Sequence, residues 1–304
     1  MPDASPVTNL VSIIVPTFNR AALLPRALRS CVQQTYPNLE LIVVDDGSTD
    51  NTPEVVTSFQ REDPRIRYVR QPNQKLPAAL NAGFRASRGE FFTWISDDNL
   101  FHPEAVAIMA GALQKRSDLG LVYCGYDIVD GEGNLLQKVR PPGPESIFTH
   151  NCVQACFMYR RKVYEAIGDY DPAWLYVEDY DYWLRVQQQF KLAHLPEVQP
   201  FSLVIHGGSL TSQLGAPRQK FLIAKVQIHH ASPWSSKLRI LSAAPAQIAE
   251  AYAAQGERGR AALGCLLYVL FKPWQGYRWR HAQEILRRPS QRCLGEPAER
   301  PMLG

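Results

Sequence analysis

The sequence predicts an α/β fold: a mostly parallel sheet flanked by helices, with a small antiparallel part and a C-terminal helical region. Short apolar runs at residues 10–15, 39–44 and 91–95 have the composition of strands buried on both faces. Each run ends in polar residues, and apolar residues at helical spacing then follow. Strands that alternate with helices in this way form parallel sheets.

The first half of the chain supplies four such strands, the third of them at residues 65–70. The helix predicted over residues 76–87 contains Asn81 and Gly83, which are poor helix formers. Poor formers inside a helical pattern indicate close approach to a ligand or to neighbouring backbone.

The pattern changes after residue 101, where antiparallel pairing is expected. A single strand over residues 119–129 is followed by a glycine-containing turn and a returning strand over 135–139, which is typical of a hairpin. The remaining predicted elements are helices over 103–116, over 162–167 and from 178, strands over 153–159 and 201–205, and a helical region from 219 onward.

Composition excludes several classes of protein. The chain has 304 residues, of which 45% are hydrophobic and 20% charged, so it can bury a sizeable core. Its six cysteines form no Cys-x-x-Cys pair, which argues against a zinc module and favours a reduced, cytoplasmic compartment. The polar first nine residues lack a signal-peptide core, and no apolar run approaches the roughly 20 residues needed to cross a bilayer.

Charge divides the chain unevenly. Residues 1–217 hold 19 Lys+Arg and 24 Asp+Glu, a net charge of −5, whereas residues 218–304 hold 14 and 5, a net charge of +9. A basic C-terminal third suggests an anionic neighbour, either a membrane or nucleic acid. The alternative is a solvated basic tail.

Two carboxylates end the strand at 91–95. Asp97 and Asp98 follow it directly, and open α/β sheets bind ligands at the carboxyl ends of their strands. Adjacent aspartates repel each other, and their hard oxygen ligands suit Mg²⁺ or Mn²⁺, so we expect a cation here. The alternative is a solvated turn before the helix that starts near Pro103.

Polar residues also follow the first two strands. Phe18, Asn19 and Arg20 lie on a strand-to-helix loop, where an aromatic ring, an amide and a guanidinium could hold a base and a phosphate. Asp46 could accept hydrogen bonds from a nucleoside. The alternative for residues 45–50 is a glycine turn followed by a helix cap.

Two later motifs are less specific. Glu178, Asp179 and Asp181 lie in the first turn of a predicted helix, where carboxylates favour the helix dipole, although one of them could face a pocket. His206 precedes two glycines and could bind a metal or a phosphate. A surface turn is the alternative for His206.

Together these residues resemble the family 2 glycosyltransferases, which have the GT-A fold. The resemblance covers roughly residues 10–212 and rests on four motifs in the family's order: residues 15–20, residues 44–50, residues 96–99 before Pro103, and residues 178–181 before Trp183. Ile95 and Leu76 depart from the pattern, because many members have Asp and Gly there.

The resemblance implies a role for each motif. The residues it assigns to the nucleotide sugar, the metal and the catalytic base are Pro16, Thr17, Phe18, Arg20, Asp46, Asn73, Lys75 and Asp97 for the donor, Asp98 and His206 for Mg²⁺ or Mn²⁺, and Asp179 for the base. It further implies a GT-A catalytic domain over 1–217, with a nucleotide-sugar half at about 10–100 and an acceptor half at about 101–212, before a basic helical region at 218–304.

The implied reaction is metal-dependent transfer of a sugar from a nucleotide diphosphate to the hydroxyl of a sugar or lipid-linked acceptor. One base and no nucleophile implies inversion at the anomeric carbon. Residue types alone leave Asp179, Asp181 and Glu178 open as the base. We expect a role in bacterial polysaccharide, lipopolysaccharide or other glycoconjugate synthesis, and no nucleic acid partner.

Two other functions on this fold are a nucleotidyltransferase and a non-catalytic nucleotide-sugar binder. A nucleotidyltransferase usually carries a glycine-rich phosphate loop near the first strand, and residues 16–20 contain no glycine. A binder would lack the base or the carboxylate pair, and both are present.

The apolar run at 261–271 is too short to span a bilayer. Basic and aromatic residues beside it favour peripheral contact with the inner face of a membrane. A core helix and a homo-oligomer contact are the alternatives. The flanking residues are Arg258, Arg260, Lys272, Trp274, Tyr277, Arg278, Trp279 and Arg280.

Overall fold

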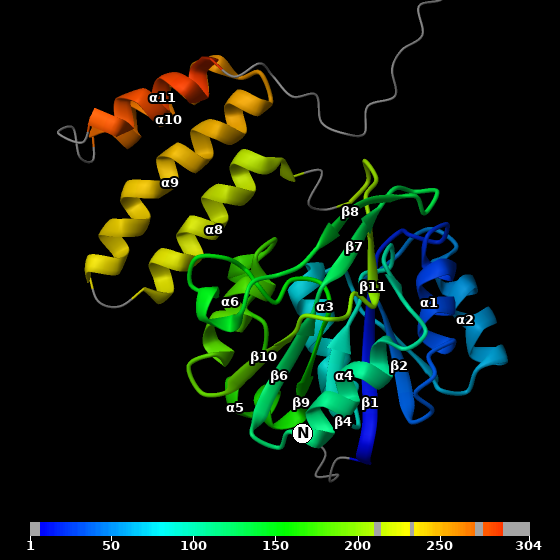
Figure 1. Cartoon of the computed structure of the whole chain (residues 1–304). Coiled ribbons are helices and arrows are strands. Elements are labelled where there is room, and N and C mark those ends of the chain that lie inside the picture. Colours follow the sequence, from blue (N-terminus) through cyan, green and yellow to red (C-terminus); the bar gives the residue numbers. More distant parts are fainter. Residues whose placement is uncertain (1–6, 210–213, 232–233, 271–275, 288–304) are drawn as a thin grey trace, which may run out of the picture. The chain divides into compact units, whose positions relative to one another are not determined.

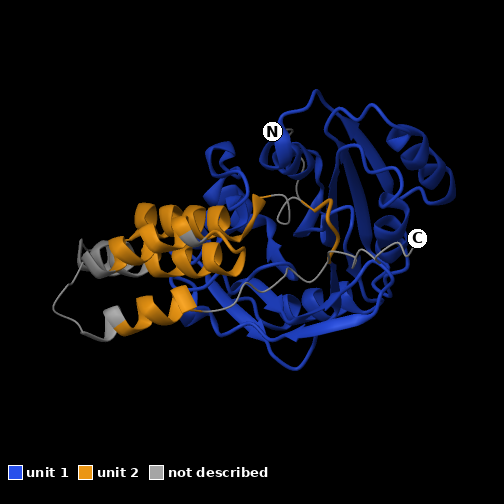
Figure 2. Cartoon of the chain, turned by 90° about the horizontal axis from the view of Figure 1, so that it is seen from above, with its two compact units in different colours: residues 1–204 blue, residues 205–304 orange. Residues whose placement is uncertain are grey.

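The computed structural model describes residues 7–209, 214–231, 234–270 and 276–287. Contacts between Cα atoms divide the chain into two compact units, Met1–Val204 and Ile205–Gly304, coloured blue and orange in Figure 2. Both predicted motifs that carry the base and the carboxylate pair lie in the first unit. The assignment of residues 1–217 as a catalytic domain stays a prediction.

The first unit is built on a seven-stranded sheet with the order β10-β6-β9-β4-β1-β2-β3 (Figure 1). β1 pairs in parallel with β2 and β4, β2 with β3, and β6 with β10, whereas β9 is antiparallel to both of its neighbours. This confirms the predicted mostly parallel sheet. The strands are β1 Val7–Thr17, β2 Leu39–Asp45, β3 Ile66–Arg70, β4 Gly89–Trp94, β6 Leu119–Cys124, β9 Phe157–Arg160 and β10 Lys191–Leu195.

A second, four-stranded sheet has the order β5-β11-β7-β8. Its strands are β5 Leu100–Phe101, β7 Tyr126–Val129, β8 Leu135–Val139 and β11 Phe201–Val204. β7 and β8 form the predicted hairpin. The short strand β5 and the half-exposed edge strand β10 were not predicted, because neither has a continuous apolar run.

The prediction of one strand over residues 119–129 was wrong. The chain breaks at Gly125, and β6 and β7 join different sheets. A Cβ atom at Gly125 would lie 2.7 Å from the Val139 carbonyl oxygen and 2.8 Å from Gln199 Cγ. A glycine is therefore required where the chain leaves one sheet for the other.

Helices cover both faces of the seven-stranded sheet. Side chains alternate along β1, so that Val11 and Ile13 face one helix layer while Ile14 faces the other. The first layer packs in the aliphatic core, and the second contributes an aromatic cluster around Phe84 and Phe92. The layers are α1 Leu24–Val32, α2 Thr52–Glu62 and α4 Ala105–Lys115, and α3 Lys75–Ala86, α5 Arg161–Ile167 and α6 Glu178–Val186.

The poor helix formers in α3 are explained by neighbouring protein. A Cβ atom on Gly83 would lie 2.5 Å from Ile14 Cγ2, so only glycine lets α3 approach the sheet this closely. Asn81 is buried; its Nδ2 donates to the Tyr170 carbonyl oxygen and its Oδ1 accepts from the Tyr170 amide, each at 2.8 Å. Of the two predicted causes, close approach to neighbouring structure is the one observed.

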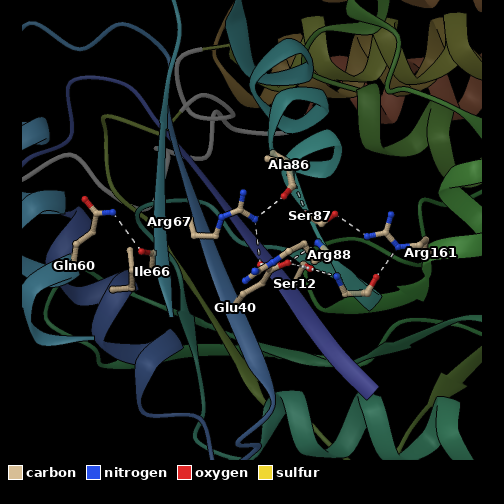
Figure 3. Close-up of polar contacts among 11 residues, drawn as sticks. Ser12, Glu40, Gln60, Ile66, Arg67, Ala86, Ser87, Arg88 and Arg161 are labelled. Atoms are coloured by element: carbon tan, nitrogen blue, oxygen red, sulfur yellow. Dashed lines mark hydrogen bonds and ion pairs between the residues drawn. The ribbon is translucent and has the colours of Figure 1, made fainter. Parts of the chain in front are cut away.

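The buried carboxylate of Glu40 on β2 bonds residues of the neighbouring chain segments near the amino ends of the strands (Figure 3). Glu40 accepts hydrogen bonds from Ser12 Oγ at 2.7 Å, from the Arg88 amide at 2.6 Å and from Arg88 Nε at 3.0 Å. Arg67 Nη1 adds a fourth bond at 3.3 Å, and Ser12 Oγ also accepts from the Gly89 amide at 2.9 Å. We call these five residues the Glu40 network.

The second unit contains the helices α8 Ala216–His230, α9 Trp234–Ala254, α10 Arg258–Leu270 and α11 Gly276–Arg287, which confirms the helical prediction. Its core consists mainly of small side chains from α9, α10 and α11. A Cβ atom on Gly264 would lie 2.8 Å from Ala249 Cβ, so this glycine permits close packing of α10 on α9. Within the described residues, no helix has both the length and the apolar character needed to cross a membrane.

Candidate active site

β4, β1, β2 and β3 are adjacent and parallel, so the loops after them meet at one edge of the sheet, here called the carboxyl edge. We number the loops after β1, β2 and β3 as the first, second and third, and hydrogen bonds join the first two. The Asp46 amide donates to the Thr17 carbonyl oxygen at 2.9 Å, and the Asn19 amide donates to Ser48 Oγ at 2.9 Å. Asn19 Oδ1 accepts from the Thr49 amide at 2.7 Å. The predicted nucleotide loop is thus braced by its neighbour.

Asp46 holds the next loop. Its Oδ1 accepts from the Gln74 amide and from Gln71 Nε2, and its Oδ2 accepts from the Lys75 amide, all at 2.8 Å. The side chain is 4% exposed. Oδ1 already accepts two bonds and Oδ2 only one, so Oδ2 retains a lone pair that can accept one further hydrogen bond, as from a nucleoside.

Glycine at position 47 lets the second and third loops touch. Its φ is +83°, and a Cβ atom there would lie 2.9 Å from the Asn73 amide nitrogen. Lys75 has a φ of +72°, an uncommon conformation for a non-glycine residue. The structure therefore brings Asp46, Asn73 and Lys75 together, as the prediction of a common donor site requires.

Asp97 lies beside the first loop and is 8% exposed. Burial raises the pKa of its carboxyl to about 7, against the opposing effects of the Thr17 hydroxyl, Arg20 and the Phe18 amide. The charge of Asp98 raises this pKa further. The structure thus groups Thr17, Phe18 and Arg20 around the first carboxylate of the pair.

Thr17 Oγ1 is a buried polar atom that makes no hydrogen bond of normal geometry with the described residues, although it lies close enough to affect Asp97. Such an atom carries a desolvation cost that a bound group can relieve. Phe18, next in the chain, is 42% exposed and offers a ring face at the same edge. Both observations agree with a ligand site here.

The carboxylate pair fits a divalent cation. Two buried or partly buried carboxylates with hard oxygen ligands repel each other unless a positive charge is shared between them. The described residues contain no group of three or more His, Cys, Asp or Glu placed to hold a metal. Mg²⁺ sites built from one or two carboxylates plus substrate phosphates need no third protein ligand, so the pair is compatible with such a site.

The predicted metal ligand His206 lies at the start of the second unit. Its Nδ1 accepts a hydrogen bond from the Gly208 amide at 3.2 Å. This local bond is typical of the turn that was the alternative prediction for His206. Its role as a metal ligand stays a prediction.

The three carboxylates at the start of α6 differ in their surroundings. Asp181 is 2% exposed and accepts from Arg185 Nε at 3.0 Å as an i,i+4 ion pair. Asp179 is only partly buried by surface area, and its Oδ2 accepts from Asn151 Nδ2 at 2.8 Å. Of these two aspartates, Asp179 is therefore the one without a charged partner among its described contacts.

Glu178 is 4% exposed, and its Oε2 has no hydrogen-bond partner among the described residues. Burial, and then the charge of Asp179, raise the pKa of Glu178 to about 8. Burial also raises the pKa of Asp179, whereas the bond from Asn151 lowers it. Two carboxyls whose pKa values rise together in one place are characteristic of functional sites.

Tyr170 connects α6 to the end of β4. Trp94 is the last residue of β4, and its Nε1 donates to Tyr170 Oη at 3.3 Å. Burial raises the pKa of Tyr170, and the charge of Asp179 on α6 adds to the effect. Tyr170 therefore bonds the end of β4, three residues before Asp97, and also senses the charge of Asp179.

Asn151 and Tyr170 were missed by sequence reasoning. Asn151 lies in irregular chain between β8 and β9 and belongs to none of the four motifs. Its only local signal is a polar residue immediately before the buried Cys152 and Val153. Tyr170 belongs to the aromatic cluster and stacks on Tyr182 with ring centroids 4.1 Å apart, so it has the appearance of an ordinary core residue.

Comparison with known proteins agrees with this geometry. A protein from Rickettsia typhi named as an uncharacterised glycosyltransferase is 33% identical over 187 residues, which is 58% of either chain. Residues 1–349 of S. aureus TarS, solved with UDP, share the fold with a TM-score of 0.59, 17% identity and coverage of 91% of this chain and 89% of that one. The mannosyltransferase PcManGT of Pyrobaculum calidifontis, solved with GDP-Man and Mn²⁺, has a TM-score of 0.56, 20% identity and coverage of 91% and 85%.

The family model described as "Glycosyl transferase family 2" matches residues 12–168, about half of the chain. These residues include part of β1, all of β2, β3 and β4, the carboxylate pair and Asn151. Sequence, fold and site geometry therefore place this chain in glycosyl transferase family 2.

Proposed function

We propose that this chain transfers a sugar from a nucleotide-diphosphate sugar to an acceptor hydroxyl, with inversion at the anomeric carbon. One observation supports the proposal: the loops after β1, β2, β3 and β4 lie at one edge of the sheet, where Asp97 interacts with the first loop and Asp46 bonds the loop after β3, and Tyr170 bonds Trp94 at the end of β4 and senses the charge of Asp179. A donor held at the loops would thus have a carboxylate near its sugar.

The donor would lie along the loops that the structure groups together. Arg20 and Lys75 offer positive charge to a diphosphate, and the exposed ring of Phe18 offers a face to a base. Asp46 and Asp97 would accept hydrogen bonds from the nucleoside. A divalent cation at Asp97 and Asp98, Mg²⁺ or Mn²⁺, would neutralise charge on the diphosphate as it leaves. Pro16, Thr17 and Asn73 complete the proposed donor set.

Asp179 would act as the general base. It accepts the proton of the acceptor hydroxyl while the acceptor oxygen forms a bond to the anomeric carbon and the bond to the diphosphate breaks. A single displacement from the face opposite the leaving group inverts the configuration. Burial raises the pKa of Asp179, which strengthens it as a base. Asp181 is a weaker candidate, because it is already paired with Arg185.

The neighbours solved with UDP and with GDP-Man and Mn²⁺ support a nucleotide-sugar donor and a divalent cation for this chain. The matched segment spans 58% of the Rickettsia typhi relative, so the reaction of the whole protein is itself part of the proposal. A role in polysaccharide or other glycoconjugate synthesis stays a prediction.

We also propose that the second unit contacts an anionic membrane surface. α10 buries Ala261 and Cys265 in the core of the unit, while Leu263, Leu266 and Leu267 are 58%, 50% and 46% exposed on another face. Apolar side chains beside a net charge of +9 suit a membrane interface. Lys272 and Trp274 lie outside the described residues, as do the side chains of Tyr277, Arg278 and Trp279.

Membrane contact is tested by co-sedimentation with anionic vesicles. We expect binding at low salt that weakens at high salt and in a Leu263→Ser/Leu266→Ser double variant. Full-length protein that stays in the supernatant at low salt would exclude this contact, and a concentration-dependent mass in solution would favour a homo-oligomer instead.

The enzymatic proposal is tested by combining a panel of nucleotide sugars with Mn²⁺. We expect one donor to bind and to release nucleotide in the presence of a suitable acceptor. Asp179→Asn should reduce transfer about 10²-fold or more, the scale of general-base catalysis, while donor affinity stays near wild type. Asp118→Asn, on the exposed Asp118, is the matched control. Full activity in Asp179→Asn would exclude this base, and donor binding without any transfer would favour a non-catalytic binder.

A further inference from the structure

We propose that Asn151 is a positioning residue that orients the Asp179 carboxylate and keeps it ionised. This inference rests on the proposed role of Asp179 as the base. Asn151 Nδ2 donates to Asp179 Oδ2 at 2.8 Å, across 28 positions of sequence. Among the described residues, it is the side chain that donates a hydrogen bond to this carboxylate.

The orientation of the Asn151 amide follows from its second contact. Its Oδ1 accepts from the Gln154 amide at 3.4 Å. A backbone N–H can only donate, so the oxygen of the Asn151 side chain must face Gln154. The NH₂ group then faces Asp179, whose ionised carboxylate can only accept. Asn151 is therefore the donor in this hydrogen bond and Asp179 the acceptor, which favours the charged form of Asp179.

The chain segment that carries Asn151 is held at several points. Tyr123 Oη donates to the Pro142 carbonyl oxygen at 2.7 Å, and Tyr180 Oη, from α6 itself, donates to the Ile147 carbonyl oxygen at 2.8 Å. Tyr126 Oη bonds the side chain of Gln154. Residues 142–154 are thus fixed both to the strands and to the helix that bears Asp179, which is what a positioning role requires.

The electrostatic surroundings explain why a neutral donor is suitable. Among the described residues, the titratable groups whose pKa the charge of Asp179 raises are Glu178 on α6 and Tyr170, and neither supplies positive charge. Burial raises the pKa of Asp179 and so disfavours its ionised form, whereas the hydrogen bond from Asn151 lowers this pKa. A cationic partner, such as Arg185 beside Asp181, would make the carboxylate a poorer base. The hydrogen bond from an amide orients the carboxylate and favours its ionised form with a smaller loss of basicity.

The test is the pH profile of transfer. Removing the donor in Asn151→Ala should move the acidic limb of kcat to higher pH by about one unit, so that kcat falls roughly tenfold below the limb and recovers at alkaline pH. Isosteric Asn151→Asp places a second carboxylate at Asp179 and should move the limb further. The KM for the donor should stay near wild type in both variants.

Asn134→Ala is the matched control, because Asn134 Nδ2 donates to Asp130 Oδ2 at 2.9 Å on the exposed β7–β8 turn. It should leave the profile unchanged. A wild-type acidic limb in folded Asn151→Asp, together with an inactive Asp179→Asn, would overturn the inference and leave the proposed base intact. An active Asp179→Asn would instead overturn the base, and the inference with it. Equal loss of activity at every pH in both Asn151 variants would indicate a structural role and also overturn it.

Discussion

Buried carboxylates differ in their hydrogen bonding between the two ends of the strands of the seven-stranded sheet. Near the amino ends, here called the amino edge, Glu40 is 2% exposed and accepts four hydrogen bonds. The donors are Ser12 Oγ, the Arg88 amide, Arg88 Nε and Arg67 Nη1. Asp97 at the carboxyl edge is 8% exposed, and Glu178 at the start of α6 is 4% exposed. Glu178 Oε2, and Thr17 Oγ1 beside Asp97, lack hydrogen-bond partners among the described residues. Both oxygens of the buried Glu40 carboxylate have hydrogen-bond donors, whereas Glu178 has an oxygen with none among the described residues.

The pKa values show the consequence. Burial alone would raise the pKa of Glu40, but the Arg88 amide, the Ser12 hydroxyl and the Arg88 guanidinium lower it overall. Burial raises the pKa of Asp97 to about 7 and that of Glu178 to about 8, because the hydrogen bonds and charges that oppose it there do not offset it. A carboxylate that is fully paired stabilises the fold, whereas one left short of partners can respond to a ligand or a proton.

Glu178 gives the largest expected difference between the edges. Its pKa of about 8 in the folded protein exceeds the ordinary 4.5, so the native state holds a proton that the unfolded chain loses between these values. Stability from this group is therefore complete below pH 4.5 and is lost as pH rises to about 8. Isosteric Glu178→Gln cannot ionise and should be more stable than wild type at pH 8, by at most about 5 kcal/mol, and nearly equal to it at pH 4.

Chemical denaturation of both proteins at pH 4, 6 and 8 measures this gap. A gap that stays constant with pH would show that Glu178 is ionised in the native protein, and the contrast between the two edges would then fail.

Glu40 should behave in the reverse sense. Because its pKa is lowered in the folded protein, its contribution is present above the ordinary pKa of 4.5 and is lost as pH falls. Glu40→Gln should destabilise the protein by about 3 kcal/mol at pH 7, since it leaves Ser12 and the guanidinium of Arg88 poorly paired, and by less at pH 4.

Nucleotide affinity of Glu40→Gln at 10 °C should match wild type, because the Glu40 network lies near the other end of the strands. Glu62→Gln, on the exposed end of α2, is the matched control and should change stability by less than about 0.5 kcal/mol. A large loss of nucleotide affinity in folded Glu40→Gln would contradict the separation of scaffold and site.

Asp98 tests the carboxyl edge with a smaller energy. Asp98→Ala should fold normally and lose at least about tenfold in affinity for a nucleotide diphosphate in the presence of Mn²⁺, because the cation loses one of its two proposed ligands. In EDTA the two proteins should bind nucleotide equally. Calorimetry with and without the metal measures both values, and unchanged affinity in Mn²⁺ would remove Asp98 from the proposed metal site.

Much of the fold was predictable because its signals are local. The buried strands β1, β2 and β4 are continuous apolar runs, and their loops meet at one edge by the geometry of parallel strands. The edge strand β10 and the change of sheet at Gly125 were not predictable, since an edge strand needs no apolar run and the bend depends on residues as distant as Gln199.

The candidate site divides in the same way. Asp97, Asp98 and Asp46 follow apolar runs directly, so the sequence alone indicates them. Asn151 acts on Asp179 across 28 positions, and Asn81 meets Tyr170 across 89, which no local pattern reveals. The choice between Asp179 and Asp181 also depended on a contact, the ion pair with Arg185, although that pair has helical i,i+4 spacing.

Two glycines provide the finest test of how the carboxyl edge is built. Gly47 and Gly133 have similar positive φ values, +83° and +93°, so alanine at either position adds backbone strain of about 1 kcal/mol. Only Gly47 also has a close neighbour: its Cβ would lie 2.9 Å from the Asn73 amide nitrogen, whereas nothing lies within 4 Å of a Cβ on Gly133.

Gly47→Ala should therefore cost about 1 kcal/mol more than Gly133→Ala, because the loop at Asn73 must shift. That shift should also weaken nucleotide binding a few-fold in Gly47→Ala and leave it unchanged in Gly133→Ala. Denaturation and calorimetry on the pair separate strain from contact. Equal stability losses, with equal nucleotide affinities, would show that the loop bearing Asn73 and Lys75 adjusts freely and does not help to shape the donor site.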